Sequence, residues 1–176
     1  MKILRRIDNF FNGVNHDLKL FNAKSSLAIG VITLILGIIS WFVGGRADRV
    51  TLFFIFPRSA MPLGLMYFLW AISFAFIGII LGGVLFGCEK YKRRDSTKIA
   101  VFLILSYLFS LCFYTVFFKT LSPFITFILI IISEIFCLLA ILSSIRCYAL
   151  WSLCMILHML WLIYNGYVAI SIALIN

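Results

Sequence analysis

Long apolar blocks are the feature of this sequence that most constrains its fold. Four of them follow residue 60, and another precedes it. Hydrophobic residues make up 64% of the 176-residue chain and charged residues only 12%, whereas soluble domains are about half apolar and about a quarter charged. The bilayer must therefore be the solvent for most of the chain. Because unpaired backbone groups are costly in hydrocarbon, each crossing is a helix or part of a closed barrel, and continuous rather than alternating blocks favour helices.

Five blocks are long enough to cross a bilayer, which requires about 20 apolar residues. The predicted spans are residues 26–44, 61–87, 99–118, 121–145 and 147–175. Pro62 begins the second span, and Ser122 and Pro123 fit the N-cap and first helical position of the fourth. The turn between the last two spans is very short, so they should form an antiparallel hairpin. The predicted fold class is an all-α membrane protein with a five-transmembrane-helix bundle over residues 25–176.

The N-terminal segment, residues 1–24, is basic and amphipathic. Within it, residues 3–18 predict a short helix that lies on the inner membrane surface; a flexible basic tail is the alternative. The apolar face of this helix would consist of Ile3, Ile7, Phe10, Phe11, Val14 and Leu18.

Basic residues give the chain a net charge of +9, but they lie in the gaps between apolar blocks. This placement indicates orientation in a membrane rather than binding to nucleic acid. Most Lys and Arg residues fall on the side of the N-terminal segment and of the loop between the second and third spans. The positive-inside rule then predicts a cytoplasmic N-terminus and an outside C-terminus, in a membrane that we expect to be the bacterial cytoplasmic membrane.

Ionisable residues are scarce inside the predicted spans. Glu134 lies near the middle of the fourth and His158 near the middle of the fifth. Counting from the intervening turn puts them at nearly the same depth, so a contact between them is one interpretation. An acid at membrane depth is a functional candidate because burying it is costly; the alternative is a helix-to-helix hydrogen bond that only holds the bundle together.

Polar and aromatic residues recur at helical spacing on three of the predicted spans. The stripes are Trp70, Phe74 and Ile77; Ser106, Ser110, Phe113 and Phe117; and Cys154, His158, Trp161 and Asn165. Such stripes are usually core packing, but a tryptophan at mid-membrane depth needs a partner for its indole N–H. Three inward stripes of this kind would build a pocket for a flat apolar ligand.

Small residues on the second span, Gly78, Gly82 and Gly83, permit close helix contact within the bundle or between protomers.

The sequence contains no phosphate loop, zinc signature, Ser–His–Asp order or Rossmann fingerprint. Its five cysteines match no metal-ligand spacing and read as small apolar residues. We therefore predict no catalytic residue and no metal site.

Two motifs point to a known family. The entry to the second span keeps a closing proline, Pro62, and a tryptophan eight residues later, Trp70. The last span keeps Trp161 and a terminal Asn176 at matching spacing. With these residues in place, the stretch from about residue 57 to 176 resembles the TspO/MBR family, the translocator proteins also called tryptophan-rich sensory proteins.

Several motif residues of that family are replaced in this chain. Ser59 and Met61 stand in the entry turn for a tryptophan and a proline, and His158 stands in the last helix for a tyrosine. In the third helix, Ser110 and Phe113 stand for an asparagine and a tryptophan. The resemblance therefore indicates a divergent member with a different set of hydrogen-bonding groups.

The resemblance implies a helical bundle with a pocket for porphyrins, other tetrapyrroles or benzodiazepine-type drugs, and a tendency to form homodimers. No firmly held cofactor is expected, with porphyrin or haem as a candidate ligand. Porphyrin degradation, linked to some bacterial relatives, is the only reaction that the resemblance brings, so we do not expect an enzyme. The expected ligand contacts are Trp70, Phe74, Ser106, Ser110, Phe113, His158, Trp161 and Asn165.

The predicted function is thus ligand binding in the membrane, for transport, sensing or degradation. Two alternatives stay open. One is a small proton-coupled exporter that uses Glu134 as its carrier. The other is a non-catalytic accessory subunit that binds another membrane protein.

Overall fold

The computed structural model describes residues 2–44, 53–87, 93–145 and 147–176. These residues form helices and no strand. The helices are α1 (Lys2–Leu20), α2 (Ala23–Gly44), α4 (Leu63–Phe86), α5 (Arg93–Thr120), α6 (Pro123–Ser144) and α7 (Ala149–Ile175). Five of them, α2 and α4 to α7, are long and apolar enough to cross a membrane. The predicted all-α fold class is confirmed, and the chain is an integral membrane protein by this criterion.

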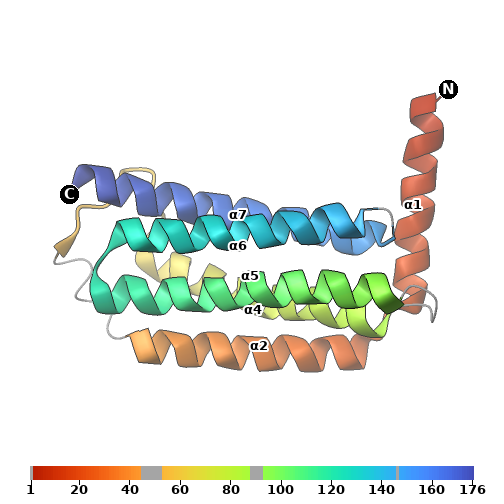
Figure 1. The fold of residues 1–176 in the computed structure, drawn as a ribbon, viewed down its shortest axis with the longest axis horizontal. Helices are drawn as coiled ribbons and strands as arrows, with labels where there is room; N and C mark the ends of the chain where they lie inside the picture. The colour runs from red at the N-terminus through yellow and green to blue at the C-terminus, as the bar shows by residue number, and fades with distance from the viewer. Residues whose placement is uncertain (1, 45–52, 88–92, 146) are drawn as a thin grey trace.

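The five apolar helices run lengthwise side by side, and α1 lies across one end of them (Figure 1). Helix α2 packs against α4 and α5, α5 against α6, α6 against α7, and α7 against α4. The bundle is therefore closed, and every span touches at least two others. Helix α1 touches the bundle mainly through α7.

The turn before α6 is built as the sequence predicts. Leu121 takes a φ of 50°, which reverses the chain, and the Ser122 side chain then accepts a hydrogen bond from the Ile125 N–H. Pro123 follows at the first helical position, where its missing N–H is not needed. The predicted hairpin of α6 and α7 also forms, and the hydroxyls of Ser144 and Ser152 lie 2.8 Å apart across it.

The glycines of α4 serve contacts inside the bundle. A Cβ on Gly82 would lie 2.5 Å from the Cα of Ser26, and a Cβ on Gly78 would lie 2.8 Å from the Cα of Gly30. No side chain fits at such distances, so glycine is what lets α2 and α4 approach so closely. The two interpretations of the glycine stripe are thereby separated: it lies within the bundle and not at a free face.

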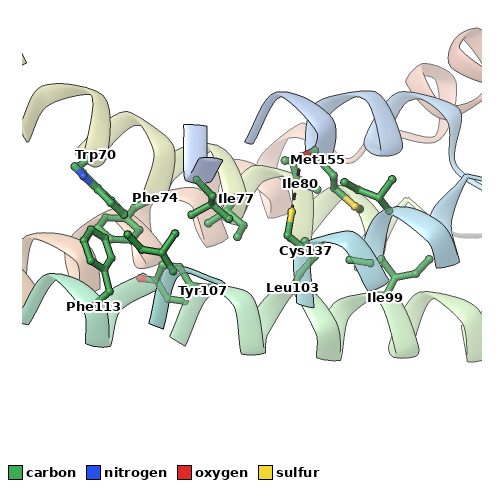
Figure 2. Close-up of a cluster of buried hydrophobic side chains, with 14 of the residues drawn as sticks. Trp70, Phe74, Ile77, Ile80, Ile99, Leu103, Tyr107, Phe113, Cys137 and Met155 are labelled. Carbon is green, nitrogen blue, oxygen red and sulfur yellow. Dashed lines mark hydrogen bonds between the residues drawn. The ribbon is translucent and has the colours of Figure 1, made fainter. Parts of the chain in front are cut away.

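The core runs along the bundle axis where α4, α5, α6 and α7 face one another (Figure 2). An aromatic group with Trp70, Phe74, Phe113 and Tyr107 lies at one end of the cluster in this view. An aliphatic and sulfur-containing group lies at the other, where the Cys137 thiol contacts the Met155 carbonyl oxygen at 3.8 Å. The aromatic end contains three of the eight residues predicted to contact a ligand, Trp70, Phe74 and Phe113 (Figure 2).

Candidate functional site

Trp70 is the centre of the aromatic end, with 3% of its surface exposed. Its indole N–H donates a hydrogen bond to the Asn165 Oδ1 on α7 at 3.1 Å. The Asn165 amide in turn donates to the main-chain oxygen of Trp161 at 2.6 Å. The expectation that a mid-membrane indole needs a partner is met here by another predicted site residue, one helix away.

Aromatic rings surround Trp70 closely. The ring centres of Phe113 and Phe74 lie 4.5 Å and 5.2 Å from it, and that of Trp161 lies 6.0 Å away with the planes at 71°. Figure 2 shows Phe74 and Phe113 beside Trp70. These contacts bring the predicted tryptophans and phenylalanines together as expected, but as a packed cluster.

Little space is left inside this cluster. The cavity that Trp70, Phe113 and Asn165 line has a volume of about 30 Å³, whereas sites for small ligands occupy about 300–1,000 Å³. Because Trp70 and Trp161 meet edge to face, their rings leave no parallel gap for a flat molecule in this conformation. Larger spaces lie instead on two sides of α4.

The first of these spaces is a groove of about 300 Å³ between α4 and α7. Three side chains on its walls carry polar atoms that are buried and hydrogen bond to none of the described residues: the Ser73 hydroxyl, both ring nitrogens of His158 and the indole N–H of Trp161. His158 is 3% exposed and Ser73 is 7% exposed. The lining residues of this α4–α7 groove are Leu69, Ile72, Ser73, Phe76, Leu157, His158 and Trp161.

Unsatisfied polar groups in such numbers are unusual. Each buried donor or acceptor without a partner costs about 1–3 kcal/mol, and native structures contain few of them. Here three side chains with such groups line one groove. The atoms themselves are covered in this conformation, so a molecule in the groove would hydrogen bond to them only after these side chains rotate toward it.

The second space is a groove of about 360 Å³ on the side of α4 that faces α2 and α5. Its walls are almost entirely aromatic and aliphatic, and Trp41 stacks on Tyr67 there with ring centres 5.7 Å apart. A Cβ on Gly37 would overlap the ring of Phe74, so this glycine lets the ring pack directly against α2. Trp70 and Phe74 line this groove as well, so the aromatic cluster forms the wall between the two spaces.

Ser106 and Ser110 were predicted to complete the ligand pocket, and the structure places them elsewhere. Both hydroxyls hydrogen bond to the Ser133 hydroxyl on α6, at 3.0 Å and 2.9 Å. The Ser133 hydroxyl also donates to the Ser106 main-chain oxygen at 2.9 Å. All three residues are fully buried, so this cluster joins α5 to α6 and lines neither groove.

The suggested contact between Glu134 and His158 does not form a hydrogen bond, because both His158 nitrogens lack a partner. His158 lines the groove with α4. Glu134 is half-buried on α6, and one of its carboxylate oxygens lies 3.3 Å from the position a Cβ would take on Gly166. The hairpin count addresses depth alone and says nothing of the direction in which each side chain leaves its helix; the Glu134 carboxylate lies near Gly166, eight residues further along α7 than His158.

Ser73 is the site residue that sequence analysis missed. It is a single hydroxyl within an apolar stretch of α4, three residues after Trp70. A lone polar side chain in an apolar stretch of this kind is the sequence signal that indicates Ser73 as a candidate site residue. No group of three His, Cys, Asp or Glu residues in the described ranges could hold a metal ion.

Comparisons with known proteins leave the family unassigned. No protein-family model matches the chain, and no curated protein matches it either.

Proposed function

We propose that this chain is a divergent member of the TspO/MBR family that binds a flat, largely apolar ligand of the tetrapyrrole class in the α4–α7 groove. The observation that carries the proposal is the convergence of three unsatisfied polar side chains, Ser73, His158 and Trp161, on one apolar groove. The retained motif residues Pro62 and Trp70 support the family part of the proposal.

The polar groups of the groove determine which hydrogen-bond donors and acceptors a ligand must carry. The Trp161 indole only donates, the Ser73 hydroxyl donates and accepts, and a neutral His158 ring has one donor and one acceptor. A ligand edge that carries both carbonyl or carboxyl oxygens and N–H groups would satisfy them together. The remaining wall is apolar, with Leu69 and Phe76, and suits the face of a conjugated ring.

Entry from the bilayer agrees with the exposure of the groove. Ile72 and Leu157 line it, and these side chains are 48% and 55% exposed. On a membrane-spanning helix such a surface faces lipid or another membrane protein. An apolar ligand dissolved in the bilayer would reach the groove laterally without crossing the packed interior.

The Trp70 cluster has a supporting role in this proposal. Its indole N–H is already satisfied by Asn165, and its ring is held by Phe113 and Phe74. It therefore acts as a rigid wall behind Trp161. The proposal thus differs from the initial expectation, in which the ligand is stacked by Trp70 and Trp161 together.

Ligand binding is preferred here over proton-coupled export. Glu134, the carrier that an exporter would need, lines neither groove beside α4. An accessory subunit without ligand stays the other alternative, and it predicts that the groove binds no porphyrin. We further propose a bacterial cytoplasmic membrane with the N-terminus inside, and a homodimer, as the basic segments and the resemblance suggest.

A protoporphyrin titration of the purified protein in detergent tests the binding proposal. Porphyrin fluorescence anisotropy is the readout, because it does not depend on the number of tryptophans in each variant. Trp161→Phe, His158→Phe and Ser73→Ala should each weaken binding. Trp41→Phe is the matched control, since Trp41 lines the other groove. Absence of saturable binding in folded wild-type protein would overturn the proposal and favour the accessory subunit.

A further inference from the structure

Helix α1 has an orientation unlike that of the other helices. It lies across the end of the bundle, and its N-terminal part extends beyond α7 (Figure 1). If the five apolar helices cross a bilayer, α1 lies roughly in the plane of the membrane surface. Its N-terminal part therefore lies beyond the described helices of the bundle (Figure 1).

Asp17 fixes α1 to the start of α7. The Asp17 side chain is only 5% exposed, and its Oδ2 accepts the N–H of Leu150 at 3.0 Å. Leu150 is the second residue of α7, whose N-cap, Tyr148, makes no side-chain cap hydrogen bond. A carboxylate from another helix thus occupies the positive end of the α7 dipole.

Gly13 brings the two helices into close contact beside this hydrogen bond. A Cβ on Gly13 would lie 3.1 Å from the Cβ of Ala149. Gly13 and Asp17 are four residues apart and therefore share one face of α1. This docking face determines which other faces of α1 are free.

A free face of α1 is apolar. Phe10, Phe11 and Leu18 are 40%, 60% and 53% exposed. Phe11 and Leu18 are seven residues apart, so they project from nearly the same side of the helix. Phe10 is seven residues before Asp17 and lies on the docking side, so the exposed apolar side chains extend from the docking side around one flank of α1. Aromatic and aliphatic side chains of this kind enter the boundary between headgroups and acyl chains.

Positive charge accompanies this face. Lys19 on α1, Lys24 at the start of α2 and Lys98 near the start of α5 are exposed. Helices α2 and α5 both begin at the α1 end of the bundle (Figure 1). The sequence of α1 adds Lys2, Arg5 and Arg6. Basic residues beside an apolar helix face are attracted to anionic headgroups.

We propose that α1 is an in-plane anchor that binds the surface of a bilayer rich in anionic lipid, with Asp17 as the latch that joins it to α7. The apolar face enters the lipid, and the exposed lysines Lys19, Lys24 and Lys98 contact the headgroup charge. Since α7 carries His158 and Trp161, the helix that binds the lipid surface is joined through Asp17 to a helix that lines the α4–α7 groove. The anchor itself does not depend on the proposed ligand.

Hydrogen exchange of the full chain in nanodiscs tests this inference. One set of nanodiscs contains phosphatidylcholine alone, and the other contains equal parts of phosphatidylcholine and phosphatidylglycerol. Amides of α1 should exchange at least about tenfold more slowly in the anionic nanodiscs, and high salt should remove most of that difference. Equal α1 exchange in both lipids would overturn the proposal.

Three variants separate the anchor from general folding. Phe11→Ser should speed α1 exchange in the anionic nanodiscs, whereas Leu174→Ser, which changes an exposed apolar residue at the other end of the bundle, should not. Asp17→Ala should speed exchange at the start of α7 while α1 stays sensitive to lipid charge. Exchange within α4 to α7 reports whether each variant is folded. Protection of α1 that follows the number of chains per nanodisc rather than lipid charge would assign the face to a second copy instead.

Discussion

The Trp70 indole N–H and the Asn165 side-chain oxygen are joined across 3.1 Å between α4 and α7. Both residues are 3% exposed, so water cannot replace either partner. The hydrogen bond therefore determines how the ring of Trp70 is held against Trp161. It is the polar contact on which the aromatic end of the bundle depends.

Replacing Asn165 by Leu should destabilise the protein. The buried indole N–H would lose its acceptor, and the expected cost is about 1–3 kcal/mol in the free energy of unfolding, nearer the lower end in a membrane. Unfolding in mixed detergent micelles with increasing dodecyl sulfate measures it. In a double-mutant cycle with Trp70→Phe, the double variant should cost less than the sum of the two single changes. Full additivity would show that the hydrogen bond contributes nothing.

The close approach of α2 and α4 gives a second prediction. Gly82→Leu should separate the two helices, because even a Cβ at this position would lie 2.5 Å from the Cα of Ser26. We expect a destabilisation of about 3 kcal/mol or more, as for severe overpacking. Gly64→Ala is the control, since nothing lies within 4 Å of a Cβ at that exposed position. Equal thermal stability of the two variants would contradict the packing described here.

The serine cluster between α5 and α6 should be structural and not involved in binding. Ser133→Ala removes the hydroxyl that contacts both Ser106 and Ser110, with an expected loss of about 1–2 kcal/mol. Because the cluster lines neither groove, porphyrin affinity should stay unchanged. A large loss of affinity in a folded Ser133→Ala protein would return Ser106 and Ser110 to the ligand site.

The number of helices, their order and the α6 cap could be predicted from sequence because each rests on a local signal. Span length and hydropathy identify five crossings, and Ser122 followed by Pro123 has a specific capping geometry. The predicted third span began at residue 99, while α5 begins at Arg93. Hydropathy marks only the apolar part of a helix, whereas α5 also includes the charged and polar residues 93–98 before it.

The rotation of each helix about its axis was not predictable in the same way. Apolar residues surround these helices almost completely, so periodicity is a weak guide to the inward face. For this reason Ser106 and Ser110 were placed in the ligand pocket although they face Ser133. For the same reason the Glu134–His158 contact was proposed from depth alone, and Trp41 was not connected with Tyr67.

His158 provides the last prediction, in which stability and binding change in opposite directions. The imidazole is buried without a hydrogen-bond partner, so His158→Leu removes an unsatisfied polar group while keeping most of the packing. The free energy of unfolding without ligand should stay equal or rise by about 1 kcal/mol. Porphyrin affinity should fall about tenfold, the loss expected for one net hydrogen bond of about 1.4 kcal/mol. Dodecyl sulfate unfolding and anisotropy titration of the same preparations measure both quantities. A variant that loses stability and keeps its affinity would show that His158 supports the bundle and does not contact the ligand.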